Sequence, residues 1–302
     1  MPPPSVFLCS ITGSQGKPLA LQLRRLGWTV KGTSRTPDSN AARQLKAAGV
    51  ELSKGDWDDV ASLTAAMSGV EKIFISTITY ADDPDRERRQ GLNIVAAAKA
   101  AKVQQVALSG SLGVVTLGDP TLSPFFKMVI TGKRVIEQAI EDGPFKHWTF
   151  IRPAFFMNNL LTPQVDYFLP HLRQENIWET VMREGERLAL ADPDDISKLV
   201  VVIFQNPEKW HGRGIPFASE LLSVPDMLEQ LGEATGTEFE EYFMTDEDID
   251  SQAVSFSFMM SDRVMRKQAE YMDMEELSSA IKLTSFSEWL EKEKETVLET
   301  YC

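Results

Sequence analysis

Cysteine and histidine are scarce in this sequence of 302 residues. Cys9 and Cys302 are too few for a disulfide framework, so we expect a reducing compartment. The histidines, His147, His171 and His211, have no metal-ligand spacing with one another or with either cysteine, and no Ser/His/Asp order accompanies them. We therefore expect neither a metal centre nor a hydrolase triad.

Long apolar runs and an excess of positive charge are also missing. The longest aliphatic run covers residues 199–204, which is too short to cross a bilayer, and residues 1–5 lack the basic and apolar regions of a secretion signal. Lys and Arg number 31 against 44 Asp and Glu, which gives a net charge of -13 and disfavours binding to nucleic acid or anionic membranes. A cytoplasmic protein without either kind of partner is expected.

Short apolar runs alternate with amphipathic segments through the first half of the chain. The runs predict strands over residues 6–9, 29–33, 50–52, 72–77, 103–109 and 148–152. Helical spacing of apolar side chains predicts helices over residues 17–26, 40–48, 60–67, 86–101 and 126–141, with Asp58 as a cap for the third. This alternation is typical of an α/β, Rossmann-type, doubly wound parallel sheet with helices on both faces.

The pattern becomes less regular after Pro153. It predicts a strand over residues 214–218, a helix over 224–234 and a closing amphipathic helix over 285–299. We expect a dinucleotide-binding domain over residues 1–153 and a smaller α/β substrate lobe over 154–302, with some chain returning to the first domain. Such a lobe would cover the carboxyl edge of the sheet, where open α/β sheets bind ligands.

A glycine-containing turn follows the first predicted strand, in the sequence Ser10-Ile-Thr-Gly13-Ser-Gln-Gly16. Glycines allow a tight bend and a close approach of the backbone to a pyrophosphate, and the following helix N-terminus supplies N–H donors and a positive dipole end. Gly13 and Gly16 are placed for this role. The alternative is a structural turn between strand and helix.

The second predicted strand is followed by a cation, Arg35, directly after Ser34. In dinucleotide-binding folds an acidic residue here grips a ribose 2′-hydroxyl, whereas a cation accepts a 2′-phosphate. Arg35 therefore predicts NADP(H) rather than NAD(H). The alternative is a solvated arginine at the start of a loop.

Four segments in order resemble motifs of one family. They are residues 12–16 (Thr-Gly-Ser-Gln-Gly), 55–59 (Gly-Asp-Trp-Asp-Asp), 90–93 (Gln-Gly-Leu-Asn) and 152–160 (Arg-Pro-Ala-Phe-Phe-Met-Asn-Asn-Leu). Together they resemble the NmrA-like family of atypical short-chain dehydrogenases, which includes the isoflavone-reductase relatives. The resemblance runs from about residue 5 to residue 235.

The resemblance implies a role for each matching residue in holding NADP(H). The pyrophosphate contacts are Thr12, Gly13, Gln15 and Gly16, the 2′-phosphate contact is Arg35 backed by Ser34, the adenine contacts are Asp56 and Trp57, the residue along the cofactor is Thr77, and the nicotinamide end is lined by Pro153, Phe155 and Phe156. A turn cap for Asp56 and core packing for the phenylalanines are the alternatives.

The proton donor of ordinary short-chain dehydrogenases is missing. Those enzymes use a Tyr-x-x-x-Lys pair. In this chain Val129 stands at the tyrosine position, while Lys133 remains and could hold the ribose or act as acid or base, as the relatives suggest. Ser111 falls where the superfamily places a hydroxyl that binds a substrate carbonyl, although a turn serine is equally compatible. Tyr80 could supply a phenol, but only its position along the chain supports that role.

Ser10 stands where the family pattern has its first glycine. A Cβ and a hydroxyl at a tight turn would weaken or alter cofactor binding, unless the hydroxyl faces the pyrophosphate. Methionines and phenylalanines within residues 254–260 leave a homodimer open.

These observations favour an NADPH-dependent oxidoreductase that reduces a small organic carbonyl, imine or conjugated alkene, for instance in secondary metabolism. A second hypothesis is a regulator that senses NADP(H) and binds a protein partner without turnover. A third is a non-redox isomerase that retains the cofactor fold.

Overall fold

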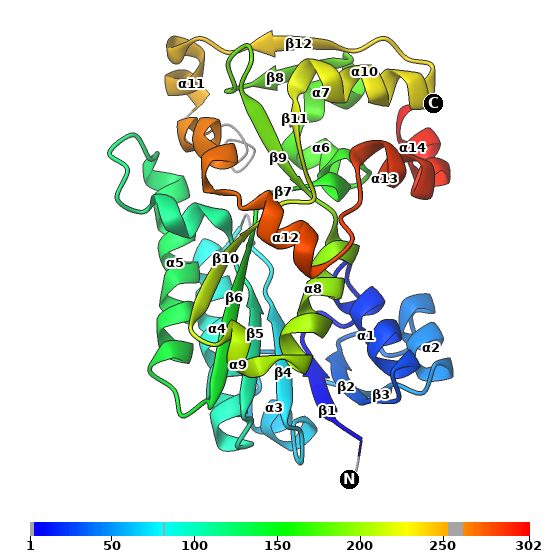
Figure 1. The fold of residues 1–302 in the computed structure, drawn as a ribbon, viewed down its shortest axis with the longest axis vertical. Helices are drawn as coiled ribbons and strands as arrows, with labels where there is room; N and C mark the ends of the chain where they lie inside the picture. Colours follow the sequence, from blue (N-terminus) through cyan, green and yellow to red (C-terminus); the bar gives the residue numbers. More distant parts are fainter. Residues whose placement is uncertain (1–2, 81, 253–261) are drawn as a thin grey trace. The chain divides into compact units, whose positions relative to one another are not determined.

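The apolar runs of the first half of the chain form one sheet in the computed structural model (Figure 1), which describes residues 3–80, 82–252 and 262–302. The chain divides into two compact units. Unit 1 comprises Met1–Ser111, Thr131–Arg152 and Ile196–Ile215, and unit 2 comprises Leu112–Ile130, Pro153–Asp195 and Pro216–Cys302. The segment 254–260, on which the homodimer expectation rested, lies outside the described residues.

The sheet of unit 1 has the strand order β10-β6-β5-β4-β1-β2-β3. Its strands are β1 (Ser5–Leu8), β2 (Thr29–Ser34), β3 (Glu51–Lys54), β4 (Lys72–Ser76), β5 (Gln105–Ser109), β6 (His147–Pro153) and β10 (Arg213–Phe217). The first six pair in parallel. The order reverses between β1 and β4, and open α/β sheets bind ligands at the carboxyl ends of the strands beside such a reversal. The predicted Rossmann-type fold is confirmed.

Helices cover both faces of this sheet (Figure 1). They are α1 (Gly16–Arg25), α2 (Asn40–Ala47), α3 (Val60–Ala66), α4 (Pro84–Ala100), α5 (Pro124–Glu141), α8 (Pro193–Gln205) and α9 (Pro207–Trp210). On one face, Leu63, Ile94 and Ile136 from α3, α4 and α5 pack against Phe7 and Val106 of the sheet. The sequence pattern predicted α1 to α5, whose apolar side chains recur at helical spacing. It did not predict α8 and α9.

The cap of α3 differs from the prediction. The N-cap is Asp59, whose carboxylate accepts a hydrogen bond from the backbone N–H of Ser62, and not Asp58. Asp58 instead accepts a hydrogen bond from the side chain of Gln90 at 2.9 Å. Two adjacent aspartates offer the same capping chemistry, so the sequence alone does not distinguish them.

Unit 2 contains two small sheets, β11-β9-β7 and β12-β8. Its strands are β7 (Phe155–Phe156), β8 (Ile177–Thr180), β9 (Arg187–Ala191), β11 (Glu220–Ser223) and β12 (Glu240–Phe243). Its helices are η1 (Leu112–Thr116), η2 (Met157–Leu160), α6 (Gln164–Phe168), α7 (Pro170–Gln174), α10 (Val224–Thr235), α11 (Asp246–Gln252), η4 (Arg263–Tyr271), α12 (Met274–Ala280), α13 (Phe286–Lys292) and α14 (Lys294–Tyr301). Phe155, Trp178, Leu190, Met227 and Trp289 share one buried core.

The closing helix predicted over residues 285–299 is two helices. α13 begins with a capping box between Ser285 and Glu288 and ends at Lys292, and α14 starts after Glu293. Trp289 on α13 and Val297 on α14 are both buried. They are separated by two helical turns, so the apolar period continues through the break and does not reveal it.

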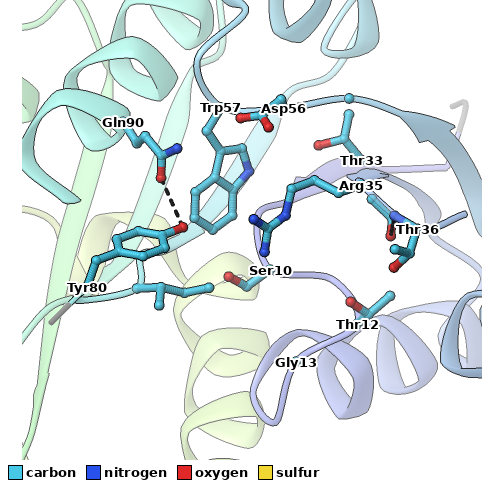
Figure 2. Close-up of a pocket in the computed structure, with 13 residues that line it drawn as sticks. Ser10, Thr12, Gly13, Thr33, Arg35, Thr36, Asp56, Trp57, Tyr80 and Gln90 are labelled. Atoms are coloured by element: carbon cyan, nitrogen blue, oxygen red, sulfur yellow. Dashed lines mark hydrogen bonds between the residues drawn. The ribbon is translucent and has the colours of Figure 1, made fainter. Parts of the chain in front are cut away.

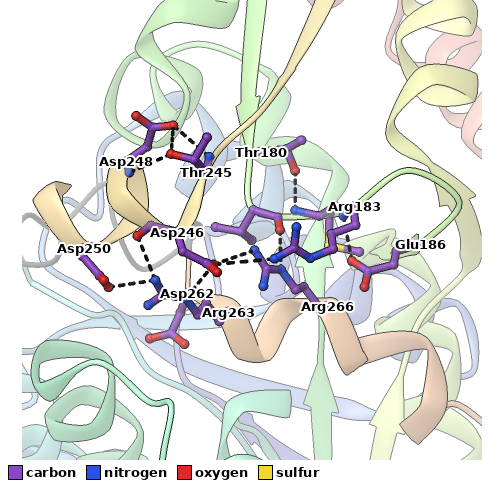
Figure 3. Close-up of polar contacts among 12 residues, drawn as sticks. Thr180, Arg183, Glu186, Thr245, Asp246, Asp248, Asp250, Asp262, Arg263 and Arg266 are labelled. Carbon is purple, nitrogen blue, oxygen red and sulfur yellow. Dashed lines mark hydrogen bonds and ion pairs between the residues drawn. The ribbon is translucent and has the colours of Figure 1, made fainter.

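A polar cluster in unit 2 joins α11 to η4 (Figure 3). Arg183, Arg263 and Arg266 converge on the carboxylate of Asp246 at 3.6, 3.3 and 3.6 Å. Arg263 also pairs with Asp250 at 2.8 Å. The arginines thus contact both turns of α11, a short helix whose first three residues are acidic.

A buried ion pair connects α5 to β6 within unit 1. Glu137 is 0% exposed in its side chain and accepts hydrogen bonds from Nε and Nη2 of Arg152 at 3.0 and 2.8 Å. Arg134 lies 3.5 Å from the same carboxylate. The arginine that opens the 152–160 motif therefore has a structural partner.

We predict that Glu137→Gln lowers the free energy of unfolding by about 3–5 kcal/mol, because it leaves the half-enclosed Arg152 guanidinium without its anion. Urea denaturation followed by circular dichroism measures the change. Glu51→Gln is the matched control: Glu51 is exposed and lies 3.9 Å from Lys31, so its loss should cost less than about 1 kcal/mol. Equal effects of the two substitutions would contradict the prediction.

Candidate functional site

The turn after β1 is built around the carbonyl oxygen of Ser10. This oxygen accepts a hydrogen bond from the backbone N–H of Gly13 at 2.8 Å. A Cβ at Gly13 would lie 3.1 Å from it, and a Cβ at Gly16 only 2.3 Å. Any side chain at residue 16 would therefore push α1 away from the end of β1. The glycine permits the close packing that brings the helix N-terminus to the carboxyl edge of the sheet.

Ser10 itself has a left-handed backbone with φ of 49°. Its hydroxyl donates to the carbonyl of Ser76 at the end of β4, at 2.9 Å. The Ser76 hydroxyl in turn accepts from the side-chain amide of Gln15 at 3.4 Å. The hydroxyl of Ser10 is thus used to join the turn to the neighbouring strand.

The N-terminus of α1 is open to an anion. Its N-cap, Gln15, makes no side-chain capping bond, and no acidic residue occurs in the first turn. The side-chain oxygen of Gln15 is buried and has no hydrogen-bond partner among the described residues. The backbone N–H of Lys17 donates to the carbonyl of Gly13 at 3.0 Å and Pro18 has no N–H, so the feature that favours a phosphate here is the positive end of the helix dipole.

A pocket of about 420 Å³ lies at the carboxyl ends of β1 to β4 (Figure 2). This volume is within the usual range for ligand sites. The residues that line it are Ser10, Thr12, Gly13, Thr33, Ser34, Arg35, Thr36, Gly55, Asp56, Trp57, Ile78, Tyr80 and Gln90.

Arg35 extends its guanidinium across this pocket, toward Trp57 and Ser10 (Figure 2). The side chain is exposed and forms no ion pair with any residue that the structure describes. Thr33 also lines the pocket; it is buried, and its hydroxyl has no hydrogen-bond partner in the described part of the chain. An uncompensated cation and an unsatisfied hydroxyl in one pocket favour a polar, anionic ligand.

Asp56 and Trp57 combine local and pocket-lining positions. The Asp56 carboxylate accepts from the backbone N–H of Asp58 at 3.1 Å, so the turn-cap alternative is present. The backbone carbonyl of Trp57 accepts from Asn93 at 3.1 Å, which ties the loop after β3 to α4. Both side chains still face the pocket (Figure 2).

Tyr80 closes the side of the pocket that faces α4. Its hydroxyl donates to the side-chain oxygen of Gln90 at 3.3 Å (Figure 2). The guanidinium of Arg86 lies over its ring, 4.4 Å from the centroid. The phenol therefore belongs to the pocket wall. The sequence offered only its place after β4 as a signal.

Lys133 is engaged by a buried carboxylate. Its ammonium lies 2.5 Å from Glu87, which also accepts hydrogen bonds from Thr77 at 2.6 Å and Thr79 at 2.7 Å. Burial opposes ionisation of Glu87, but the charge of Lys133 and the hydrogen bonds from Lys133, Thr77 and Thr79 outweigh it and hold the pKa of this carboxyl below its usual range. The carboxyl of Glu87 is therefore ionised at neutral pH.

Of the residues predicted from the sequence, the structure brings six into the pocket and others beside it. Those lining it are Thr12, Gly13, Ser34, Arg35, Asp56 and Trp57. Gln15 and Gly16 form the adjoining turn, and Thr77 and Lys133 surround Glu87. Pro153, Phe155 and Phe156 belong to unit 2. Their roles toward a cofactor stay predictions.

Sequence reasoning assigned no role to several residues of the site. They are the pocket residues Thr33, Thr36, Gly55, Ile78 and Gln90, and the carboxylate Glu87; Gly55 and Gln90 were noted only as members of the 55–59 and 90–93 motifs. The signal that could have found the first four is their place at or after the ends of β2, β3 and β4, since the carboxyl ends of parallel strands share one edge.

Two expectations concern the tyrosine of ordinary short-chain dehydrogenases. Val129, which the resemblance puts at the position of that tyrosine, lies on α5, is 5% exposed and carries no group that transfers a proton. Ser111, the alternative hydroxyl, directly follows Gly110, whose N–H donates to the carbonyl of Ile151 at 2.8 Å. Its binding of a substrate oxygen stays a prediction.

Two classes of site are missing from the part of the chain that the structure describes. No group of three or more His, Cys, Asp or Glu side chains there could hold a metal ion. None of the helices within residues 3–80, 82–252 and 262–302 combines the length and the apolar character that a membrane span requires.

Comparison with known proteins places this arrangement in a family. The profile described as the NmrA-like family matches residues 5–290. The NmrA-like family domain-containing oxidoreductase FrzB of Cladobotryum sp is 27% identical over 256 residues, which cover 76% of this chain and 73% of that protein.

Two solved structures share the fold. The NADPH-dependent quinone oxidoreductase QOR2 of Escherichia coli, complexed with NADPH, has a TM-score of 0.73 and 19% identity, covering 95% of this chain and 99% of that one. NmrA, a negative transcriptional regulator in complex with NADP, has a TM-score of 0.70 and 18% identity, covering 99% of this chain and 95% of that one.

We predict that Ser10→Gly is more stable than Ser10→Ala by about 1–2 kcal/mol. Both lose the hydrogen bond to Ser76, but only glycine adopts the left-handed backbone without a steric penalty. Urea denaturation of the two variants side by side tests this. If alanine is as stable as glycine, the turn does not constrain the backbone at residue 10.

A second prediction concerns pH. Because its folded-state pKa is lowered, Glu87 contributes stability that is present above its unfolded pKa of about 4.3 and is lost as pH falls through the lower folded value. The free energy of unfolding of Glu87→Gln should therefore lie well below that of the wild type at pH 7 and approach it below about pH 4. Denaturation curves between these limits measure the gap, and a gap that stays constant would contradict the assignment.

Proposed function

The chain belongs to the NmrA-like family, and from this premise we propose that it is an NADPH-dependent reductase of a small organic carbonyl, imine or conjugated alkene. The observation that carries the proposal is the uncompensated Arg35 in a pocket beside the uncapped N-terminus of α1. The oxidoreductases among the similar proteins support the reductase function, and the neighbours complexed with NADPH or NADP support the cofactor.

The residues present suit NADPH. The turn of Gly13 and Gly16 with the N-terminus of α1 would hold the pyrophosphate, and Arg35 would hold the 2′-phosphate. The unsatisfied oxygens of Gln15 and Thr33 are polar atoms that a hydroxyl-rich cofactor could satisfy. The net charge of -13 makes these local donors necessary, since the protein as a whole repels an anion.

When bound, NADPH supplies a hydride from its nicotinamide ring. The chain's part is to bind and orient it. Lys133 carries N–H donors at the end of a buried network, and Ser111, two residues after β5, is the hydroxyl that the resemblance puts at a substrate oxygen. Because Val129 stands where the usual tyrosine would be, this position has no phenol that could donate a proton to the substrate.

A second candidate function is an NADP(H)-sensing regulator that binds a protein partner without turnover. The observation that favours it is the apolar Val129 where the resemblance puts a tyrosine, together with the pocket that Arg35 lines. A sensor needs only differential affinity for a partner between the NADPH-bound and NADP⁺-bound forms. Partner pull-downs at matched NADPH and NADP⁺ concentrations, beside a reductase assay, separate the two functions.

The low cysteine content supports a cytoplasmic location for either function.

We predict that the wild type binds NADPH more tightly than NADH, and that Arg35→Ala weakens NADPH binding about 10- to 100-fold, the worth of a hydrogen bond to a charged group, with little effect on NADH. Isothermal titration calorimetry measures both affinities. Arg25→Ala, an exposed arginine in the last turn of α1, is the matched control and should leave both affinities unchanged. A wild type that binds neither nucleotide would overturn the proposal.

A further inference from the structure

We propose that Glu87 is the positioning residue of the cofactor site, which fixes Lys133 as a hydrogen-bond donor and keeps it from acting as an acid or base. The inference rests on the proposed function for the identity of the ligand that Lys133 meets. Its structural basis is the arrangement around Glu87 within unit 1.

The surroundings of Glu87 compensate the negative charge of its buried carboxylate. Its residue is 3% exposed, and it lies in the first turn of α4, where the helix dipole favours a negative charge. One oxygen receives Lys133 and Thr77, and the other receives Thr79. The carboxylate therefore determines where the ammonium lies relative to the end of β4.

Lys133 keeps donors for a ligand. An ammonium has three N–H groups, and the described residues provide it with one hydrogen-bond acceptor, Glu87. Its side chain is 15% exposed, so the remaining donors are shielded but not sealed. A structural lysine of this burial would be expected to satisfy them within the protein. The unused donors point to a polar group supplied by a ligand.

The neighbouring charge determines what kind of group this is. Lys133 and Glu87 form a neutral pair, so the ammonium attracts a distant anion weakly and acts through short hydrogen bonds. That suits uncharged hydroxyls, such as those of a cofactor ribose, better than a phosphate. Arg35, which has no such partner in the described chain, suits a phosphate.

The same pair disfavours proton transfer from Lys133. If the ammonium gave up its proton, Glu87 would remain as a buried anion without its cation, which is a strongly unfavourable state. Of the two roles that the sequence left open for Lys133, holding the cofactor is therefore favoured over acid or base chemistry.

The test is a double-mutant cycle read by NADPH affinity. We expect Glu87→Gln and Lys133→Met each to weaken NADPH binding by about tenfold, and the double variant to be no weaker than Lys133→Met, because Glu87 acts through Lys133. Glu87→Asp, which keeps the charge, should recover part of the affinity. Glu141→Gln, a carboxylate on α5 paired with Arg134 at 2.8 Å, is the matched control and should change nothing.

A ligand-free measurement separates this inference from the proposed function. Lys133 should react more slowly than the more exposed Lys46 with an amine-directed acetylating reagent, as mass spectrometry of the peptides measures, and Glu87→Gln should accelerate Lys133 alone by about tenfold. If NADPH does not bind but this labelling changes as expected, the proposed function fails and the positioning role stands. Unchanged labelling, or an equal loss of affinity from Glu87→Gln with and without Lys133, overturns the inference.

Discussion

The close approach of Gly16 to the carbonyl of Ser10 is the constraint on which the site depends. With 2.3 Å between that oxygen and a Cβ built at Gly16, only glycine lets α1 start directly behind β1. The result is an uncapped helix N-terminus at the carboxyl edge of the sheet, beside the reversal of strand order between β1 and β4. The pocket residues follow from this placement, because they lie at the ends of the neighbouring strands.

Arg35 and Lys133 have opposite electrostatic surroundings. Arg35 is exposed and lacks an anionic partner among the described residues, so its full charge is offered to a ligand. Lys133 is enclosed and neutralised by Glu87, so it offers directed hydrogen bonds with little net field. In a chain of net charge -13, this division places the long-range attraction at the 2′-phosphate end proposed for Arg35.

Strands β1 to β6 and helices α1 to α5 follow from sequence because their apolar side chains recur with the period of a strand or a helix, whereas α8 and α9 were not predicted. The place of Arg35 in the pocket follows as well, since it depends on a fixed position after the second strand. Glu87 does not: an acidic residue in the first turn of a helix is ordinarily explained by the dipole, and its partner Lys133 is 46 residues away along the chain. The cap at Asp59 was missed because the adjacent Asp58 offers the same chemistry, and the break at Glu293 was missed because the apolar period continues through it.

Two ion pairs with buried carboxylates, Glu87 and Glu137, fix the position of one face of α5. They link the 152–160 motif to Lys133. Lys133 and Glu137 are four residues apart, so they lie on the same face of that helix. Lys133 pairs with Glu87 of α4, and Glu137 pairs with Arg152 of β6. The second pair holds α5 against the sheet, and the first sets the ammonium at the end of β4. The arginine of the 152–160 motif thus supports the site through α5, because moving this helix would move Lys133 with it.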